Sequence, residues 1–257
     1  MRILIIALTA VALATTPAVA DELKPSLYFG SLDELSHDDF SSTASSVSDA
    51  LFVVGLTAPI VLELGRNDDD TGRRLAAYAG GVAATGAAAG LLKELWRRPR
   101  PYNFHTSPAV RAYAKHAGKD ATVSFPSGHT ALTFAAAAAG GWIYADGSTD
   151  TTARAGVWFA GTAVAGATAV LRMRAGKHYP SDVTMGIVLG AGAVAVPALV
   201  LGDVDLSGTE VAAMVGGTLL GAGLMSVLPF PKDVSLPLDV SPLALRDGGG
   251  LVLTVVR

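Results

Sequence analysis

Six long apolar stretches occupy most of the chain between residues 47 and 228. Each has 16–19 residues, and apart from Asp49 none of them contains a charged residue. At ~1.5 Å rise per residue, each would form a helix roughly 24–28 Å long. The pattern predicts an all-α fold, a bundle of about six helices, from these stretches: Val47–Leu62, Leu75–Leu92, Thr130–Ala145, Ala155–Leu171, Val183–Leu201 and Val211–Leu228.

The interiors of these stretches are rich in small residues, as in Gly80-Gly81 and Ala135–Ala139. A helix on the surface of a soluble protein shows a polar stripe, and these stretches show none. Small residues also let helix backbones approach closely, which suits packing inside a membrane. We therefore expect a membrane-embedded bundle, with a compact soluble bundle as the alternative.

The segments outside the bundle differ in character. Residues 1–20 read as an export signal, with an apolar core and a small-x-small cleavage site at Ala18-Val19-Ala20. Residues 21–46 are polar, and residues 229–257 form a tail. In that tail, Leu243–Arg246 and Leu251–Val256 predict a small C-terminal β-hairpin around a glycine-rich turn. The expected domain is thus residues 47–228, in an exported protein.

Composition narrows the possible chemistry. The formal net charge is −3, which gives no basic field for nucleic acid. The chain has no cysteine, and this excludes disulfides, thiolate nucleophiles and cysteine metal sites. No metal-ligand cluster is visible, and His37, His105 and His116 lie in polar segments where we expect them to be solvated. The sequence says nothing about protein partners.

Chemically active side chains gather at the ends of the apolar stretches. Lys93 and Arg100 follow the second stretch, His129 precedes the third, Arg172 follows the fourth and His178 precedes the fifth. If the helices alternate in direction, all five residues lie at one end of the bundle. We therefore expect an active site at that end.

The stretch Pro126-Ser127-Gly128-His129 has the features of an anion site at a helix start. Ser127 is a good N-cap residue, and Gly128 permits close approach of the backbone. The free N–H groups and the positive end of the helix dipole favour a negatively charged ligand. Ser127 and Gly128 can therefore donate hydrogen bonds to a phosphoryl oxygen, with His129 beside it.

The residues around His178 suit nucleophilic catalysis. Asp182 follows four residues later, and a carboxylate bonded to one imidazole nitrogen frees the other as a nucleophile or base. The cations Lys93, Arg100 and Arg172 match the charge of a phosphate group. We interpret three other arginines as charges at the membrane interface: Arg97, Arg98 and Arg174.

These motifs resemble the three-part signature of the type 2 phosphatidic acid phosphatases, a superfamily that includes bacterial lipid phosphatases, non-specific acid phosphatases and vanadium haloperoxidases. The resemblance covers roughly Leu75 to Leu201. The family often has serine before the arginine of the third motif, where this chain has Leu171. The matching motifs are Lys93-x6-Arg100-Pro101, Pro126-Ser127-Gly128-His129 and Arg172-x5-His178-x3-Asp182.

The resemblance implies roles for these residues. His178 would attack phosphorus, Asp182 would orient His178, and His129 would protonate the leaving oxygen. The remaining matches would bind the substrate phosphate without a metal or other cofactor: Lys93, Arg100, Ser127, Gly128 and Arg172.

The sequence thus predicts a metal-independent phosphatase that acts through a phosphohistidine on phosphate monoesters or diphosphates. The expected partner is a phosphorylated lipid or a small phosphate ester, and the expected location is the inner membrane with a periplasm-facing site. One alternative is a soluble periplasmic non-specific acid phosphatase. Another is a vanadate-dependent haloperoxidase that uses the same pocket.

Overall fold

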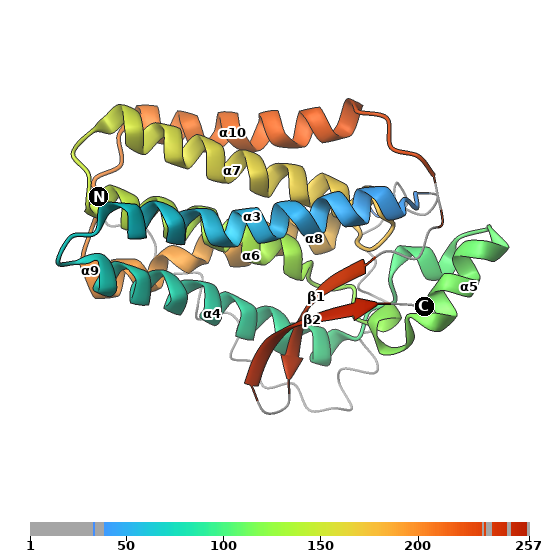
Figure 1. Ribbon diagram of the computed structural model, residues 1–257. Helices are drawn as coiled ribbons and strands as arrows, with labels where there is room; N and C mark the ends of the chain where they lie inside the picture. Colours follow the sequence, from blue (N-terminus) through green and yellow to red (C-terminus); the bar gives the residue numbers. More distant parts are fainter. Residues whose placement is uncertain (1–32, 34–38, 233, 235–237, 246–247, 256–257) are drawn as a thin grey trace.

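The computed structural model describes residue 33, residues 39–232 and 234, and two strands near the end of the chain. The expected export signal, residues 1–20, lies outside the described residues, as does most of the polar segment 21–46. The predicted helical fold is confirmed (Figure 1). The α-helices are α3 Ser42–Arg66, α4 Thr71–Trp96, α5 Pro108–His116, α6 Gly128–Asp146, α7 Thr151–Arg174, α8 Pro180–Ala191, α9 Ala195–Leu201 and α10 Gly208–Val227.

Polar residues set the starts of several helices. The Ser41 side chain accepts a hydrogen bond from the Ala44 N–H at the start of α3, five residues before the apolar stretch begins. Asp150 caps α7 in the same way. Ser207 and Glu210 cap α10 reciprocally. These caps satisfy backbone N–H groups that have no partner within the helix.

The fifth apolar stretch differs from the single helix that we expected. It divides into α8, a short 3-10 turn η4 (Gly192–Val194), and α9. Pro197 lies in the first turn of α9 and has no N–H to continue the hydrogen bonding of α8, so the division falls just before it. The link between the first two motifs is also structured, with η2 (Pro101–Phe104), α5 and η3 (Gly118–Thr122).

Helix α6 lies at the centre of the bundle. It packs against α3, α4, α7 and α8, and most of its residues are buried. Among the described residues, five segments, which do not include α6, are long and apolar enough to cross a membrane: Ser42–Arg66, Thr71–Phe104, Thr151–Arg174, Pro180–Leu201 and Gly208–Val227. The burial of most residues of α6 fits a helix that contacts other helices on most sides.

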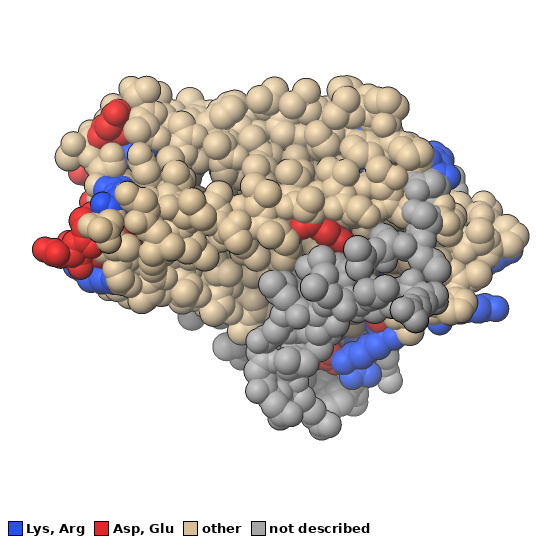
Figure 2. All heavy atoms as spheres, in the orientation of Figure 1, with Lys and Arg blue, Asp and Glu red and all other residues tan. Residues whose placement is uncertain are grey.

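Charged side chains gather toward the two ends of the bundle. Figure 2 shows a surface over α3, α7 and α10 that is largely free of Lys, Arg, Asp and Glu. At the end away from the motifs, Arg74 pairs with Glu63 and Asp68, and Arg154 Nε lies 2.7 Å from Glu210 Oε1. An apolar belt between two charged ends fits a bundle that spans a bilayer.

Glycines bring two pairs of helices into close contact. A Cβ atom on Gly186 of α8 would lie 2.9 Å from the Ser127 carbonyl oxygen, and one on Gly190 would lie 2.6 Å from that of Ala131. In α10, a Cβ on Gly221 would clash with the Ala163 carbonyl oxygen of α7. The spacing of four residues in α8 is the small-x3-small pattern that lets helix backbones meet in membranes.

Two strands lie near the end of the chain, β1 (Leu238–Leu245) and β2 (Gly248–Val255). They pair antiparallel, with Leu243 opposite Gly250. The connecting residues 246–247 and the last residues 256–257 lie outside the described residues. The hairpin that we expected, which includes Arg246 and Val256, therefore stays a prediction.

We predict that Gly221→Ala destabilises the bundle by about 1–3 kcal/mol, because the added methyl group pushes α10 away from α7. Gly223→Ala is the matched control, since nothing lies within 4 Å of a Cβ there. Thermal unfolding in detergent measures both changes. Equal midpoints for the two variants would contradict the close contact between α7 and α10.

Candidate active site

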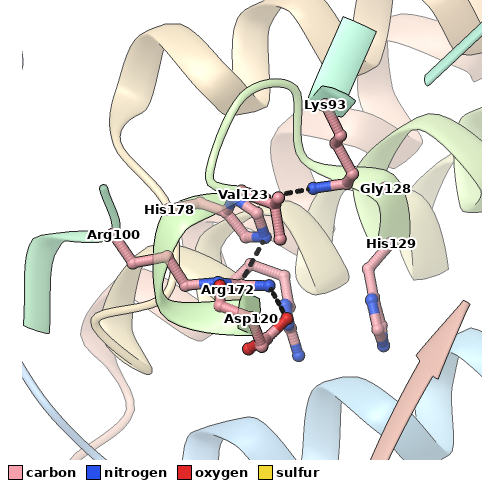
Figure 3. Close-up of a pocket in the computed structure, with 8 residues that line it drawn as sticks. All are labelled: Lys93, Arg100, Asp120, Val123, Gly128, His129, Arg172 and His178. Atoms are coloured by element: carbon pink, nitrogen blue, oxygen red, sulfur yellow. Dashed lines mark hydrogen bonds and ion pairs between the residues drawn. The ribbon is translucent and has the colours of Figure 1, made fainter. Parts of the chain in front are cut away.

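A small pocket lies at one end of the bundle, where α4, α6 and α7 end or begin. Its volume is about 50 Å³. Since one water needs ~10–15 Å³ by this measure, the pocket has room for a few atoms, which is the size of one phosphoryl group. Figure 3 shows the residues that line it: Lys93, Arg100, Asp120, Val123, Gly128, His129, Arg172 and His178.

The fold brings these residues together from distant parts of the chain. Lys93 lies in the last turn of α4 and Arg172 in the last turn of α7. His129 lies in the first turn of α6, and His178 comes just before α8. Between α7 and α8 the chain turns at Gly176, whose φ of 66° favours glycine. Six of the eight predicted site residues thus line one pocket.

The three cations predicted to bind phosphate all have partners in the protein. Lys93 Nζ donates to the Val123 carbonyl oxygen at 2.6 Å. Arg100 Nη2 lies 2.6 Å from Asp120 Oδ1, an acidic residue of the pocket that the sequence analysis did not identify. Arg172 Nη1 donates to Asp49 Oδ1 at 3.1 Å. Carboxylates therefore compensate the arginine charges while side chains of all three cations still face the pocket (Figure 3).

The hydrogen bonds of His178 determine which ring nitrogen is free. Nδ1 lies 2.8 Å from the Ser124 carbonyl oxygen. Because a carbonyl only accepts hydrogen bonds, Nδ1 carries the proton. Nε2 then has a lone pair, and it lies 3.3 Å from Arg100 Nη1 at the pocket. This tautomer presents an unprotonated nitrogen to a bound ligand.

The charge state of His178 is set by its surroundings. Burial lowers the pKa of the ring well below its usual value, and the positive charges of Arg100, Lys93 and Arg172 lower it further. His178 is therefore neutral at physiological pH. A neutral imidazole beside the positively charged side chains of lysine and arginine is suited to act as a nucleophile.

Asp182 is close to His178, but it does not line the pocket. Its Oδ2 lies 3.6 Å from His178 Nδ1, and the ring instead donates its direct hydrogen bond to the Ser124 carbonyl oxygen. The carboxylate accepts hydrogen bonds from the Ser124 hydroxyl and from the Tyr179 N–H at 2.9 Å. Asp182 therefore holds the two residues that position the ring, a different geometry from the simple pair that the spacing predicted.

His129 has an acidic partner that the sequence analysis did not identify. Its Nε2 lies 2.9 Å from Asp49 Oδ1, and its ring centroid is 4.4 Å from that of Phe52. Asp49 belongs to α3 and also binds Arg172. A lone carboxylate within an apolar helix marks a functional site by default, and that signal was available in the sequence.

The structure does not place Ser127 on the pocket wall. Ser127 is buried, its Oγ accepts a hydrogen bond from Thr130 Oγ1 at 2.9 Å, and its N–H donates to the Asp182 carbonyl oxygen at 3.0 Å. It links α6 to α8. Of the two donors that we expected at the helix start, only Gly128 lines the pocket.

Arg98 is not at the membrane interface as we expected. It is buried, and it lies 2.6 Å from both Asp182 Oδ1 and Asp33 Oδ2. Its guanidinium carbon is 3.9 Å from the centroid of the Tyr179 ring. The interpretation was wrong because Arg97 ends α4 in a left-handed conformation, which turns the following residue inward.

The other histidines lie outside the pocket. His105 Nδ1 accepts a hydrogen bond from the Ser107 N–H, and His116 is exposed on α5. His37 lies outside the described residues. Within the described part of the chain, no group of three or more His, Asp or Glu side chains is placed to hold a metal ion.

Comparisons with known proteins place the chain in a family. The chain matches the PAP2 superfamily over residues 74–203, about half of its length. It is also similar to a lipid A 1-phosphatase of Rhizobium johnstonii, with 34% identity over 110 residues. That match covers 43% of this chain and 41% of the relative. No solved structure matches the chain.

We predict that inorganic phosphate raises the thermal unfolding midpoint of the detergent-purified protein, and that orthovanadate raises it more at equal concentration. A ligand at 100 times its Kd stabilises a protein by about 2.7 kcal/mol. Arg172→Gln should remove the shift, while Arg111→Gln, which changes an exposed arginine of α5, should keep it. An equal shift in both variants would place the anion elsewhere.

Proposed function

Because this chain belongs to the PAP2 superfamily, we propose that it is a phosphatase that hydrolyses phosphate esters or diphosphates of membrane lipids through a phosphohistidine on His178. The observation that carries the proposal is the unprotonated Nε2 of a buried, neutral His178 at a pocket lined by three cations. A nucleophile and three positive charges therefore line a pocket with about the volume of one phosphoryl group.

The cations provide the binding step. Lys93, Arg100 and Arg172 would surround the phosphoryl oxygens, and the N-terminus of α6 at Gly128 would add its positive dipole. The charge of a phosphoryl transition state spreads over its equatorial oxygens, so these groups would stabilise it more than the free ester. Arg100 would bind both Asp120 and the phosphate, so the Asp120 side chain would shift as the phosphate enters.

The two histidines, one in the first turn of α6 and one just before α8, then have separate roles in the reaction. The Nε2 lone pair of His178 attacks phosphorus, an N–P bond forms and the bond to the leaving oxygen breaks. His129 gives its proton to that oxygen. The deprotonated His129 next takes a proton from water, which attacks phosphorus, breaks the N–P bond and releases inorganic phosphate. Burial and the positive charge of Arg172 lower the pKa of the His129 ring to about 4, whereas Asp49, 2.9 Å away, raises it; the negative charge of a bound phosphate would add to the effect of Asp49 and favour the protonated ring at the start of this cycle.

The membrane geometry favours a lipid substrate. Five segments of the described chain are able to span a bilayer, and the pocket lies at one end of the bundle. A lipid phosphate at headgroup level would reach this pocket while its tail stays in the hydrocarbon, where each buried CH₂ contributes ~0.8 kcal/mol. The similarity to a lipid A 1-phosphatase supports the same substrate class. We propose an inner-membrane location with the pocket facing the periplasm.

Phosphate release in detergent micelles tests this function. Phosphatidic acid or undecaprenyl diphosphate should be hydrolysed with a higher kcat/KM than glycerol phosphate, because the tail concentrates the substrate at the pocket. His178→Ala should remove turnover, and His116→Ala, the exposed control histidine, should not change it. A radiolabelled substrate should leave an acid-labile, base-stable label on the wild-type protein only.

Other results would support the alternatives. Equal efficiency on glycerol phosphate and on lipids, with the protein in the soluble periplasmic fraction, would indicate a non-specific acid phosphatase. Bromide oxidation with added vanadate and peroxide, without phosphate release, would indicate a haloperoxidase. A covalent label retained by His178→Ala would exclude His178 as the nucleophile.

We predict that the acidic limb of kcat/KM lies below pH 6.5, the usual pKa of histidine. The reason is the sign of the shift: a lowered pKa keeps the His178 nucleophile neutral as the pH falls. Arg100→Gln removes a positive charge beside the ring, so the pKa should rise and the limb should move to higher pH. Arg111→Gln is the control, and all profiles share the ionisation of the same substrate. A limb that moves to lower pH in Arg100→Gln would contradict this account.

A further inference from the structure

We propose that Asp33 is a positioning residue for the nucleophile, acting on His178 through Arg98 and Asp182. This inference rests on the proposed phosphatase function. Asp33 lies outside the segment that matches the PAP2 superfamily, residues 74–203, and belongs to none of the three signature motifs. Its carboxylate is nevertheless buried behind the pocket.

The contacts of Asp33 reach two of the three motifs. Oδ2 accepts from Arg98 Nη2 at 2.6 Å and from Ser181 Oγ at 2.9 Å, and Oδ1 accepts from the Ser181 N–H at 3.1 Å. Arg98 lies between Lys93 and Arg100 of the first motif, and Ser181 lies beside Asp182 of the third. Burial raises the pKa of the Asp33 carboxyl, but the hydrogen bonds from Arg98 and Ser181 outweigh it, and the net pKa is lowered. Asp33 is therefore a permanent anion at neutral pH.

Arg98 carries the contact onward to the nucleophile. Its Nη1 donates to Asp182 Oδ1 at 2.6 Å and to Ser181 Oγ at 2.7 Å, and its carbonyl oxygen accepts from the Ser124 N–H at 2.8 Å. Asp182 accepts from the Ser124 hydroxyl, and the Ser124 carbonyl oxygen holds His178 Nδ1. Arg98 thus contacts both residues that set the tautomer and direction of the ring: Asp182 through its guanidinium and Ser124 through its backbone carbonyl oxygen.

Asp33 acts on the nucleophile because it shares the Arg98 guanidinium with Asp182. With both in place, Arg98 is held at Nη1 and Nη2, over the face of the Tyr179 ring. Without Asp33, the guanidinium keeps its bonds to Asp182 and Ser181 but loses the one that fixes its second nitrogen. A guanidinium that moves more holds Asp182 and Ser124 less firmly. The His178 ring then samples orientations in which Nε2 does not face phosphorus. The bonds from Arg98 and Ser181 to Asp33 lead to Asp182 and His178, so we expect the change to act on the position of the nucleophile rather than on phosphate binding.

The experiment compares Asp33→Asn with Asp68→Asn in the full-length protein. Asp68 also pairs with a buried arginine, Arg74, but at the opposite end of the bundle. We expect Asp33→Asn to lower kcat by roughly 10–100-fold, the range for outer partners of active-site groups, with KM unchanged. Asp68→Asn should keep the wild-type kcat and KM. Asp33→Glu, which keeps the charge, should recover part of kcat.

Ser181→Ala keeps every charge and serves if Asp33→Asn does not fold. It removes the hydroxyl that joins Asp33 to Arg98, and it should lower kcat in the same direction by a smaller factor. A wild-type kcat in folded Asp33→Asn, or in Ser181→Ala if Asp33→Asn is unfolded, would overturn the inference. So would a loss in Asp33→Asn that appears only in KM or that Asp68→Asn shares. Absence of phosphatase activity in the wild-type protein would instead overturn the proposed function.

Discussion

Charge buried within an apolar bundle is stable only when a group of opposite sign lies beside it, and this requirement shapes the whole pocket end of the molecule. Arg98, Arg100 and Arg172 are all buried, and each lies within 3.1 Å of a carboxylate oxygen. Removing one partner of such a pair costs about 3–5 kcal/mol, because the remaining charge stays buried. The two arginines that line the pocket, Arg100 and Arg172, can therefore be assembled in advance only because Asp120 and Asp49 hold them, and Asp182 holds Arg98 in the same way.

Helix packing decides where these charges lie. Glycines at positions 186 and 190 let α8 approach α6 so closely that the Ser127 N–H reaches the Asp182 carbonyl oxygen at 3.0 Å. The starts of these two helices therefore face each other, with His129 in one and His178 just before the other. A wider separation would move apart His129 and His178, both of which line the pocket. The small residues of the apolar stretches thus control the distances in the site as well as the stability of the bundle.

The sequence predicted the helices and the convergence of the motifs well, because apolar stretches and their ends are local features. It failed where the outcome depends on the direction in which a side chain points. The spacing of His178 and Asp182 predicted that the two side chains meet, and Asp182 Oδ2 does lie 3.6 Å from His178 Nδ1, but the direct hydrogen bond of the ring goes to the Ser124 carbonyl oxygen. Whether Arg97 or Arg98 turns inward depends on the residue at which α4 ends. No pattern in the sequence specifies that residue.

The two histidines receive their support from outside the segment that matches the superfamily. Asp49 of α3 lies 2.9 Å from His129, and Asp33 reaches His178 through Arg98 and Asp182. The matched segment contains the two histidines and the three cations of the pocket, but the carboxylate that faces His129 lies on an earlier helix. A comparison restricted to the three motifs therefore omits part of the charge balance of the site. Helix α3 therefore belongs to the pocket as much as the matched segment does, because its Asp49 places a negative charge between His129 and Arg172.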